Sequence, residues 1–389
     1  MAPRHGPRVL VAPQAFKGTA DATEVAAAIA RGVIAAWPDA TTVELPLADG
    51  GEGTVRALVR STRRSLRTER VHDPLGREIT AEWGVFGDGE TAVIEMASAS
   101  GLGLLRPEER DPLRASTVGT GELLLAVAGA GFGRIIVGLG GSATNDGGAG
   151  FARAMGYRFV DASGRDLPEG GAALGRLHHL EGQTHPRLIR AALTVVCDVR
   201  NPLLGPEGAT AVYGPQKGAR PEDIVFLEEA LTRYADVVEA FLGRRVRDIP
   251  GAGAAGGLGM AFLAFLDAPI KPGAALVMEK SGFARELAQA DLVITGEGRL
   301  DDQSAFGKVT HAVGQAARAA SVPVAFLVGS VTAVGRADAG DAPVVVLAEG
   351  PEPVSERIAA AAERLAEQVQ WTLRLASVGN DHPKTESSK

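Results

Sequence analysis

The sequence is short of several features, and each shortage excludes a class of protein. Its 389 residues include one cysteine, Cys197, which excludes an internal disulfide and a cysteine-ligated zinc site. No apolar run is long enough to span a bilayer. The basic N-terminus has too short an apolar stretch for a signal peptide. We therefore expect a cytoplasmic protein with no membrane partner.

Strong charge and a P-loop are also missing. The formal net charge is -7, which argues against nucleic acid as the main partner, although a local basic pocket could still bind a small anion. The pattern G-x-x-x-x-G-K-[ST] does not occur, so a P-loop nucleotide site is excluded. Oligomeric state stays open at this stage, a homodimer included.

What is present is an alternation of strand and helix patterns. Residues 8–12 and 41–47 are predicted strands. Residues 21–36 form a predicted helix, and Asp21 and Glu24 have the spacing of a capping box at its start. Strands that alternate with helices in this way are typical of a doubly wound α/β fold.

The length of the chain favours two α/β domains. Both ends carry the apolar-strand pattern, whereas the middle begins with several short strands in succession. We predict a doubly wound Rossmann- or flavodoxin-like domain formed by residues 1–75 and 290–376. A second α/β domain, residues 76–289, is predicted as an insertion, and residues 377–389 as a disordered tail.

A glycine-rich turn, GLGGSATNDGGAG, follows an apolar run at Gly138. Gly138, Gly140 and Ala143 fit the dinucleotide fingerprint, with Asp161 about 20 residues further on, so an NAD-dependent dehydrogenase is one alternative. The residues after the turn, however, make a poor first turn of a helix. A tight turn with glycine for packing is a second alternative.

Three polar side chains favour a third interpretation of this turn. Thr144, Asn145 and Asp146 lie where a dinucleotide site needs bare backbone. Backbone N–H groups at the start of a helix bind anions, and polar side chains would fix the anion's orientation. We expect a polar anion or substrate site here.

Lysines and acids follow other predicted strands. Lys17 comes after the first strand, where ligands bind in open α/β sheets, although a solvated surface lysine would look the same. Asp49 and Glu52 flank Gly50 and Gly51 after the second strand. That acid pair suits Mg²⁺ or a hydroxyl, and an Asx turn with a helix cap is the alternative.

The same pattern continues along the chain. Asp198 ends an apolar strand, where an acid is costly unless it is paired or used. Lys217 follows in GPQKG, and Glu297 and Lys308 flank the end of a later strand. The small-residue run 251–259 implies that some backbone or ligand passes close by. Together these strand ends suit a small anionic substrate with phosphates.

Six motifs in this order resemble those of the bacterial glycerate kinase family. They are APQAFKGT, LADGGEGT, GLGGSATNDGGAG, CDVRNPLLGPEGA with GPQKGA, GAGAAGGLG, and TGEGRLDDQSAFGK. The resemblance runs from about Arg8 to about Leu375. It implies two α/β domains with the active site in the cleft between them. It also implies MgATP-dependent phosphorylation of D-glycerate, usually to 2-phosphoglycerate. A bilobed small-anion-binding protein is the non-enzymatic alternative.

The first motif departs from the family pattern. Gln14 and Ala15 stand where the family usually has an acid, often followed by Ser or Lys. We expect a changed nucleotide or metal affinity rather than a lost activity, because the other acids remain. Ser304, where Thr is common, is a milder change.

The resemblance lets roles be assigned as hypotheses. Asp198 is the predicted acid at the attacking hydroxyl, with Lys17 and Asp49 as further catalytic residues. Mg²⁺ is expected on Asp49 and Glu297, and ATP beside Gly296, Glu297 and Gly298. The predicted substrate- and phosphate-binding residues are Gly50, Gly51, Ser142, Asn145, Asp146, Lys217, Arg299 and Lys308.

Overall fold

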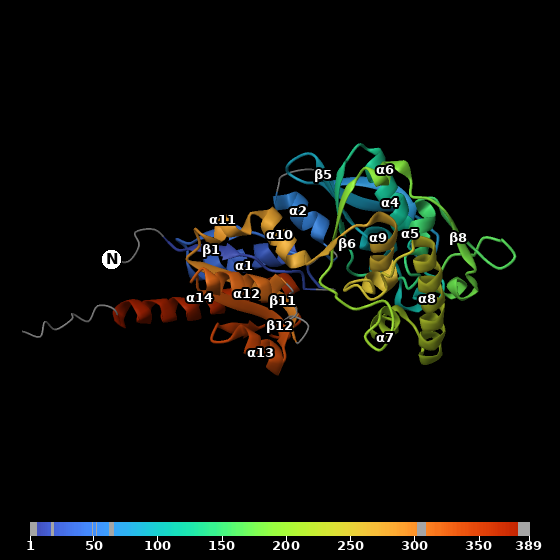
Figure 1. Cartoon of the computed structure of the whole chain (residues 1–389). Coiled ribbons are helices and arrows are strands. Elements are labelled where there is room, and N and C mark those ends of the chain that lie inside the picture. Colours follow the sequence, from blue (N-terminus) through green and yellow to red (C-terminus); the bar gives the residue numbers. More distant parts are fainter. Residues whose placement is uncertain are drawn as a thin grey trace, which may run out of the picture. The chain divides into compact units, whose positions relative to one another are not determined.

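The structure is a computed structural model that describes residues 6–16, 19–48, 50–51, 53–61, 66–301 and 309–379. The chain divides into two compact units (Figure 1). Unit 1 is Met1–Leu47 with Met278–Lys389, and unit 2 is Ala48–Val277. Unit 1 is therefore built from both ends of the chain.

The boundaries of the units differ from the predicted ones. Unit 2 begins at Ala48, not at residue 76, because β3 (Leu66–His72) is an edge strand of its sheet. Before it, α2 (Thr54–Ser61) packs on that sheet, where a Cβ on Gly84 would lie 2.1 Å from the Val59 side chain. Unit 1 resumes at Met278, within α10 (Gly273–Ser281), rather than at residue 290.

Unit 1 has a parallel sheet of five strands in the order β13-β12-β11-β1-β2. Numbered along the chain within this unit, the order is 2-1-3-4-5, that of flavodoxin-like folds, whose ligand crevice lies at the carboxyl ends of the first and third strands. The strands are β1 (Arg8–Val11), β2 (Thr41–Glu44), β11 (Leu292–Leu300), β12 (Val324–Val331) and β13 (Val344–Val346).

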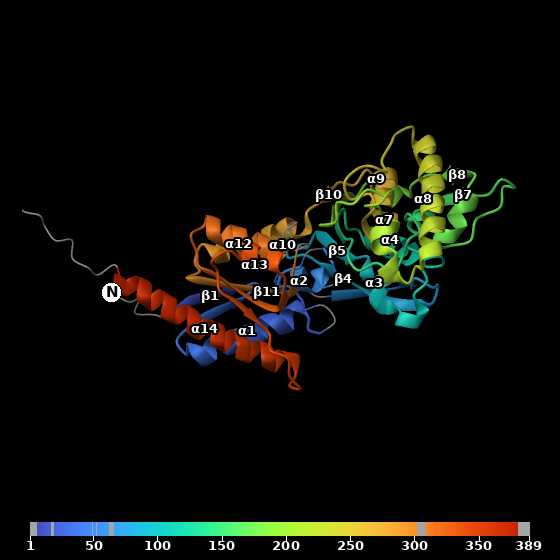
Figure 2. The ribbon, with the colours of Figure 1, turned by 90° about the horizontal axis from the view of Figure 1, so that it is seen from below.

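Helices cover both faces of this sheet. On one face α1 (Ala22–Ala36) packs against α14 (Val354–Gly379), and on the other lie α12 (Val309–Ala319) and α13 (Ala333–Ala339) (Figure 2). The Asp21–Glu24 capping box forms at the start of α1. The remaining described helix of this unit is α11 (Phe283–Leu287).

The final helix has an apolar stripe that is buried. Ile358, Leu365 and Val369 on α14 join Ile29 and Val33 of α1 in one core cluster. Each such side chain contributes roughly 1.5–3 kcal/mol when it leaves water. This packing holds the two ends of the chain together.

Unit 2 has a mixed sheet of six strands in the order β10-β9-β6-β5-β4-β3. β10, β9, β6 and β5 run parallel to one another. β4 pairs antiparallel with β5, and β3 pairs antiparallel with β4. The remaining strands of this sheet are β4 (Glu78–Val85), β5 (Thr91–Glu95), β6 (Arg134–Gly138), β9 (Ala192–Val196) and β10 (Ile270–Lys271). A separate antiparallel pair joins β7 (Tyr157–Val160) and β8 (His179–Gly182).

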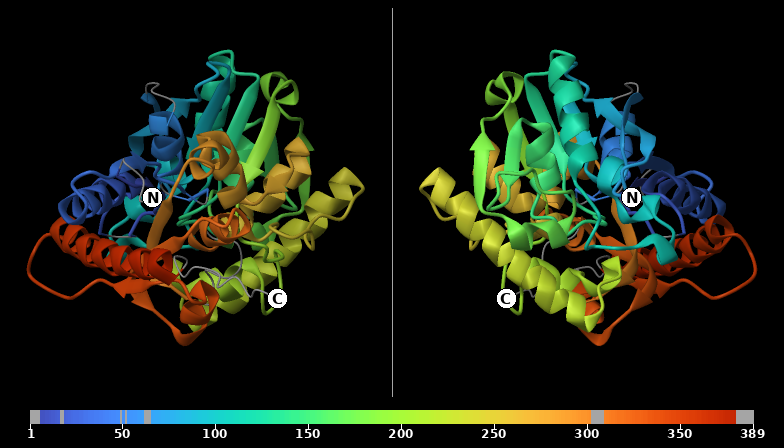
Figure 3. Two further views of the ribbon diagram at one scale, coloured as in Figure 1. Left: turned by 90° about the vertical axis from the view of Figure 1, so that its left-hand side faces the viewer. Right: turned by 90° about the vertical axis from the view of Figure 1, so that its right-hand side faces the viewer.

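Helices of unit 2 carry its large core. The longest is α8 (Pro221–Leu242), seen from two sides in Figure 3. The other helices are α3 (Ala97–Ser100), α4 (Val118–Gly129), α5 (Ala149–Ala154), α6 (Pro186–Ile189), α7 (Ala209–Tyr213) and α9 (Leu258–Leu266). The 3₁₀ turns are η1 (Leu102–Leu104), η2 (Pro107–Glu109), η3 (Gly171–Arg176), η4 (Pro215–Lys217) and η5 (Ala254–Gly257).

The predicted class, two α/β domains with a flavodoxin-like sheet from both chain ends, is confirmed. Cys197 lies in the core of unit 2. Residues 377–379 of the predicted tail continue α14, and the rest of the tail lies outside the described residues. Within the described part of the chain, no helix has the length and apolarity to cross a bilayer.

Candidate functional site

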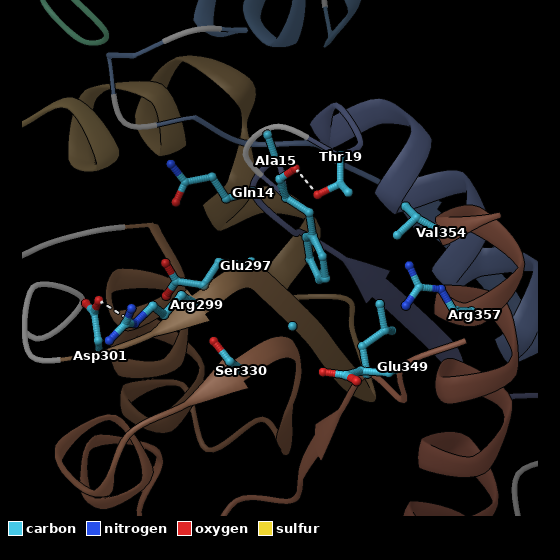
Figure 4. Close-up of a pocket in the computed structure, with 14 residues that line it drawn as sticks. Gln14, Ala15, Thr19, Glu297, Arg299, Asp301, Ser330, Glu349, Val354 and Arg357 are labelled. Atoms are coloured by element: carbon cyan, nitrogen blue, oxygen red, sulfur yellow. Dashed lines mark hydrogen bonds and ion pairs between the residues drawn. The ribbon is translucent and has the colours of Figure 1, made fainter. Parts of the chain in front are cut away.

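Unit 1 has a pocket at the carboxyl edge of its sheet, with a cavity of about 410 Å³ (Figure 4). It lies where β1 and β11 adjoin, the position at which doubly wound sheets bind ligands. Its residues come from the ends of four strands and the start of α14. They are Gln14, Ala15, Phe16, Thr19, Glu297, Gly298, Arg299, Asp301, Gly329, Ser330, Leu347, Glu349, Val354 and Arg357.

The pocket wall carries charges of both signs. On one side Glu297, 5% exposed, lies near Arg299, whose Nε is 3.3 Å from an Asp301 carboxylate oxygen. On the other side lie Glu349 and the half-buried Arg357, whose Nη1 donates to the Ala348 carbonyl at 3.1 Å. Guanidinium groups pair with phosphates, so this wall suits a phosphorylated ligand.

Several predicted site residues meet in this pocket. Glu297, Gly298 and Arg299 line it, and Gly296 precedes them in β11, paired with Leu327. A Cβ on Gly296 would lie 2.0 Å from the Leu327 carbonyl oxygen, so packing between strands requires that glycine. The predicted Lys17 and Lys308, and Ser304, lie outside the described residues.

Sequence reasoning missed the far wall of the pocket. Ser330 lies near the end of β12, Glu349 follows β13, and Arg357 lies in the first turn of α14. The strand-end rule that singled out Glu297 applies to the neighbouring strands too. It could have found these residues had the strand order been known.

The second group of predicted residues lies at the carboxyl edge of the unit 2 sheet. Gly140 N donates to the Gly50 carbonyl at 3.2 Å. A Cβ on Gly138 would lie 2.3 Å from that same oxygen, and one on Gly140 would lie 2.3 Å from Gly51 Cα. The glycines at this turn therefore make room for the chain's own loop, as the packing alternative requires. Asp49 and Glu52 lie outside the described residues.

Asp198 lies two residues past the end of β9, at the same edge. It is half-buried, and its Oδ1 accepts a hydrogen bond from Gly273 N at 2.7 Å. The neighbouring Val196 carbonyl accepts from Leu139 N at 3.1 Å, which ties β9 to the glycine-rich turn. The structure thus brings Asp198, Gly50 and the turn after Gly138 to one sheet edge.

Apart from Gly140 and Gly141, the turn is buried and internally bonded. Ser142 pairs with Gly101 through an isolated bridge, and the Asn145 amide donates to Thr210 Oγ1 at 3.0 Å. Thr144 and Asn145 are fully buried. Both therefore contact protein rather than bulk water.

Asp146 faces its own chain. Its Oδ2 accepts from Thr117 N at 2.9 Å, from Thr117 Oγ1 at 2.8 Å and from Gly150 N at 3.1 Å. Its Oδ1 accepts from Gly148 N at 3.0 Å. Burial raises the pKa of this carboxyl, while these hydrogen bonds act to lower it. The carboxylate joins the start of α4 to that of α5, which is an internal structural role.

Lys217 is also enclosed. It is 1% exposed, and its Nζ donates to the Thr144 carbonyl at 2.7 Å. Burial lowers the pKa of its ammonium from 10.5 to about 7, and the negative charge of Asp146 partly opposes the shift. The ammonium of Lys217 thus contacts the backbone of the glycine-rich turn inside the protein, away from solvent.

The small-residue run 251–259 passes along that turn. Gly147 N donates to the Gly256 carbonyl at 3.0 Å, and a Cβ on Gly256 would lie 2.0 Å from the Thr144 carbonyl oxygen. The backbone at Ala255 and Gly256 is left-handed, with φ of 52° and 68°. The backbone that the sequence predicts near this run is the chain's own.

Comparison with known proteins shows to which family the chain belongs. The model of the glycerate kinase family matches residues 9–377. The chain belongs to the glycerate kinase family. It is accordingly an enzyme, a kinase that phosphorylates glycerate.

Relatives of this glycerate kinase family member match along most of their length. The glycerate kinase of Bacillus subtilis (strain 168) is 44% identical over 375 residues, 95% of this chain and 98% of the relative. The glycerate 2-kinase of Escherichia coli (strain K12) is 46% identical, over 84% and 86%. The crystal structure of a proposed glycerate kinase 2 from Salmonella typhimurium LT2 superposes with a TM-score of 0.81 at 42% identity, over 97% and 100%.

These findings contradict two alternatives, an NAD-dependent dehydrogenase and a non-enzymatic anion-binding protein. The dinucleotide fingerprint needs a helix directly after the turn and an acid after a parallel strand. Here α5 begins only at Ala149, and Asp161 follows the antiparallel β7, bonded to the turn at Ser163 and Arg165. Membership of an enzyme family contradicts the non-enzymatic binding protein.

The family implies a magnesium ion. In the described parts of the chain, no group of three or more His, Cys, Asp or Glu side chains could hold a metal. Magnesium usually binds one or two carboxylates and takes its other ligands from substrate phosphates and water. The unit 1 pocket offers Glu297 and Asp301 among its lining residues, so its donor set fits such an ion beside a polyphosphate.

Proposed function

We propose that the protein transfers the γ-phosphoryl group of ATP to D-glycerate, giving 2-phosphoglycerate and ADP in the cytoplasm. The single observation that carries the 2-position is the 46% identity to a protein named glycerate 2-kinase. Both D-glycerate and ATP are anions, which agrees with charged groups and glycines at the strand ends of both units.

ATP is proposed to bind in the unit 1 pocket, at Gly296, Glu297 and Gly298. Arg299 and Arg357 would pair with phosphate oxygens, since guanidinium and phosphate form strong charge-assisted hydrogen bonds. Glu297 would hold Mg²⁺, and Asp49, which lies outside the described residues, stays a prediction. When bound, the ion neutralises charge on the transferring phosphoryl group. Lys17 and Lys308 remain proposed phosphate ligands.

Glycerate is proposed to bind in unit 2, at the sheet edge that gathers Gly50, Gly51 and Ser142. Asn145 orients the substrate within the same turn. Asp198 would accept the proton of the C2 hydroxyl. The hydroxyl oxygen then bonds to the γ-phosphorus of ATP, while the bond between that phosphorus and the oxygen that leaves with ADP breaks. The carboxyl edge of parallel strands, where Asp198 lies, is the usual place for such a group.

The test is ADP release by purified protein with MgATP and, in parallel, D-glycerate, L-glycerate, glycerol or no acceptor. Phosphorus NMR then identifies the phosphorylated position. Release with D-glycerate alone, with a 2-phospho product, is the expected result. A 3-phospho product would refute the regiochemistry, and release with glycerol would refute a requirement for the carboxylate.

A further inference from the structure

The predicted phosphate contact of Lys217 is at odds with its surroundings. The side chain is 1% exposed, and its ammonium donates to the carbonyl oxygen of Thr144 at 2.7 Å. A buried ammonium is costly, because a charged group loses its hydration. Lys217 therefore has a role other than stabilising the fold.

Lys217 is one of two anchors on the same turn. Thr210, on α7 of the same segment, accepts the Asn145 amide hydrogen bond at 3.0 Å. The segment from Ala209 to Lys217 therefore holds two consecutive residues of the turn, one by its backbone and one by its side chain. The Gly147–Gly256 hydrogen bond, at 3.0 Å, holds the other end.

The same segment reaches toward Asp198. Tyr213, between the two anchors, donates its hydroxyl to Asn201 Oδ1 at 3.1 Å. The Asn201 amide donates in turn to the Glu207 carbonyl at 2.7 Å, which fixes the loop that follows Asp198. One short segment thus connects the turn with the loop after the proposed proton acceptor.

We propose that Lys217 is a positioning residue, whose ammonium holds the turn of Ser142 and Asn145 in place for glycerate without contacting phosphate. The inference rests on the proposed function only in naming glycerate as the ligand of that turn. Asp146 is the charged group whose field reaches the ammonium, and the Tyr234 phenol faces the same turn beside Gly147.

The experiment compares the wild type with Lys217→Met and Thr210→Val, each of which removes one anchor at nearly constant volume. Lys280→Met, at a lysine with a 40% exposed side chain, is the control for loss of a lysine. Three properties are measured: hydrogen exchange of peptides covering residues 140–150, the KM values for D-glycerate and ATP, and the midpoint of thermal unfolding.

We expect both anchor variants to exchange faster in the turn and to raise the KM for D-glycerate about tenfold or more. The KM for ATP should change less than twofold, and the unfolding midpoint of Lys217→Met should not fall. A purely structural lysine would lower the midpoint and leave both KM values unchanged, which would overturn the inference. A rise in the KM for ATP would also overturn it, in favour of direct phosphate contact.

The two proposals fail separately. A wild type that phosphorylates no glycerate would refute the proposed function alone. Unchanged exchange in the turn of Lys217→Met would refute the anchor, whatever the activity.

Discussion

Replacing Gly256 with Ala tests whether the loop 251–259 needs a glycine where it packs against the glycine-rich turn. Gly256 has φ of 68°, and a Cβ there would lie 2.0 Å from the Thr144 carbonyl oxygen. Gly243, at the end of α8, is a matched control, because its φ is 67° and an added Cβ would meet nothing within 4 Å. The two variants share the backbone penalty and differ only in the overlap.

The expected magnitudes follow from those contacts. The left-handed conformation costs an alanine about 1–2 kcal/mol, which is the whole cost expected for Gly243→Ala. Relief of the overlap in Gly256→Ala requires a backbone shift, and overpacking of that kind adds roughly 1–3 kcal/mol. In a unit of this size, 1 kcal/mol lowers the unfolding temperature by about 2–4 °C.

Calorimetry of both variants measures the difference. Gly256→Ala should unfold at a temperature lower than Gly243→Ala by about 2–12 °C, and it should also raise the KM for D-glycerate, because the displaced backbone carries Asn145. Equal unfolding temperatures and an unchanged KM would show that the loop shifts without cost, which would refute the predicted penalty of the overlap.

Three further predictions concern individual side chains. Asp198→Asn should lower kcat by about 10²–10⁴-fold with little change in KM, as loss of a proton acceptor requires; a near wild-type kcat would remove Asp198 from the mechanism. Arg357→Gln should raise the KM for ATP about tenfold or more and leave that for D-glycerate unchanged, because a hydrogen bond to a charged group contributes about 1.5–3 kcal/mol; equal effects on both would contradict a nucleotide site in unit 1. Lys217 binds fewer protons in the folded than in the unfolded protein between its folded pKa of about 7 and its ordinary value of 10.5, so its cost to stability should shrink as pH rises. The unfolding temperature of Lys217→Met should therefore exceed that of the wild type most at pH 6 and less at pH 9, and a constant difference would contradict a buried ammonium.

Local sequence patterns were enough to predict the first strands and helix but not where the units divide. The capping box at Asp21 and the stripe on α14 depend on residues three to four positions apart, so the sequence contains them directly. Whether β3 joins the first or the second sheet depends on its partner β4 and on α2, and no periodicity within β3 encodes that choice.

The site was predictable only in part, for a related reason. Glu297 and Arg299 follow an apolar run, and that position marked them. Glu349 follows β13 and Arg357 lies in the first turn of α14, but their place in the pocket depends on the order of strands in the sheet. The burial of Lys217 depends on a carbonyl 73 positions away in the chain, which the GPQKG motif does not reveal.

The construction of unit 1 from both ends of the chain sets an order for its assembly during synthesis. Thr295 donates to the Ala12 carbonyl across 283 positions, so β1 must wait for nearly three-quarters of the chain before its neighbour β11 exists. Unit 2 is continuous and can fold as it emerges, since domains fold as units. Its folding places Gly50 and Lys271 beside Val196, near the two ends of unit 2, which shortens the loop that β1 and β11 must close. Until then β1 has an unpaired edge, a hazard for aggregation that falls on the nascent chain rather than on the finished enzyme.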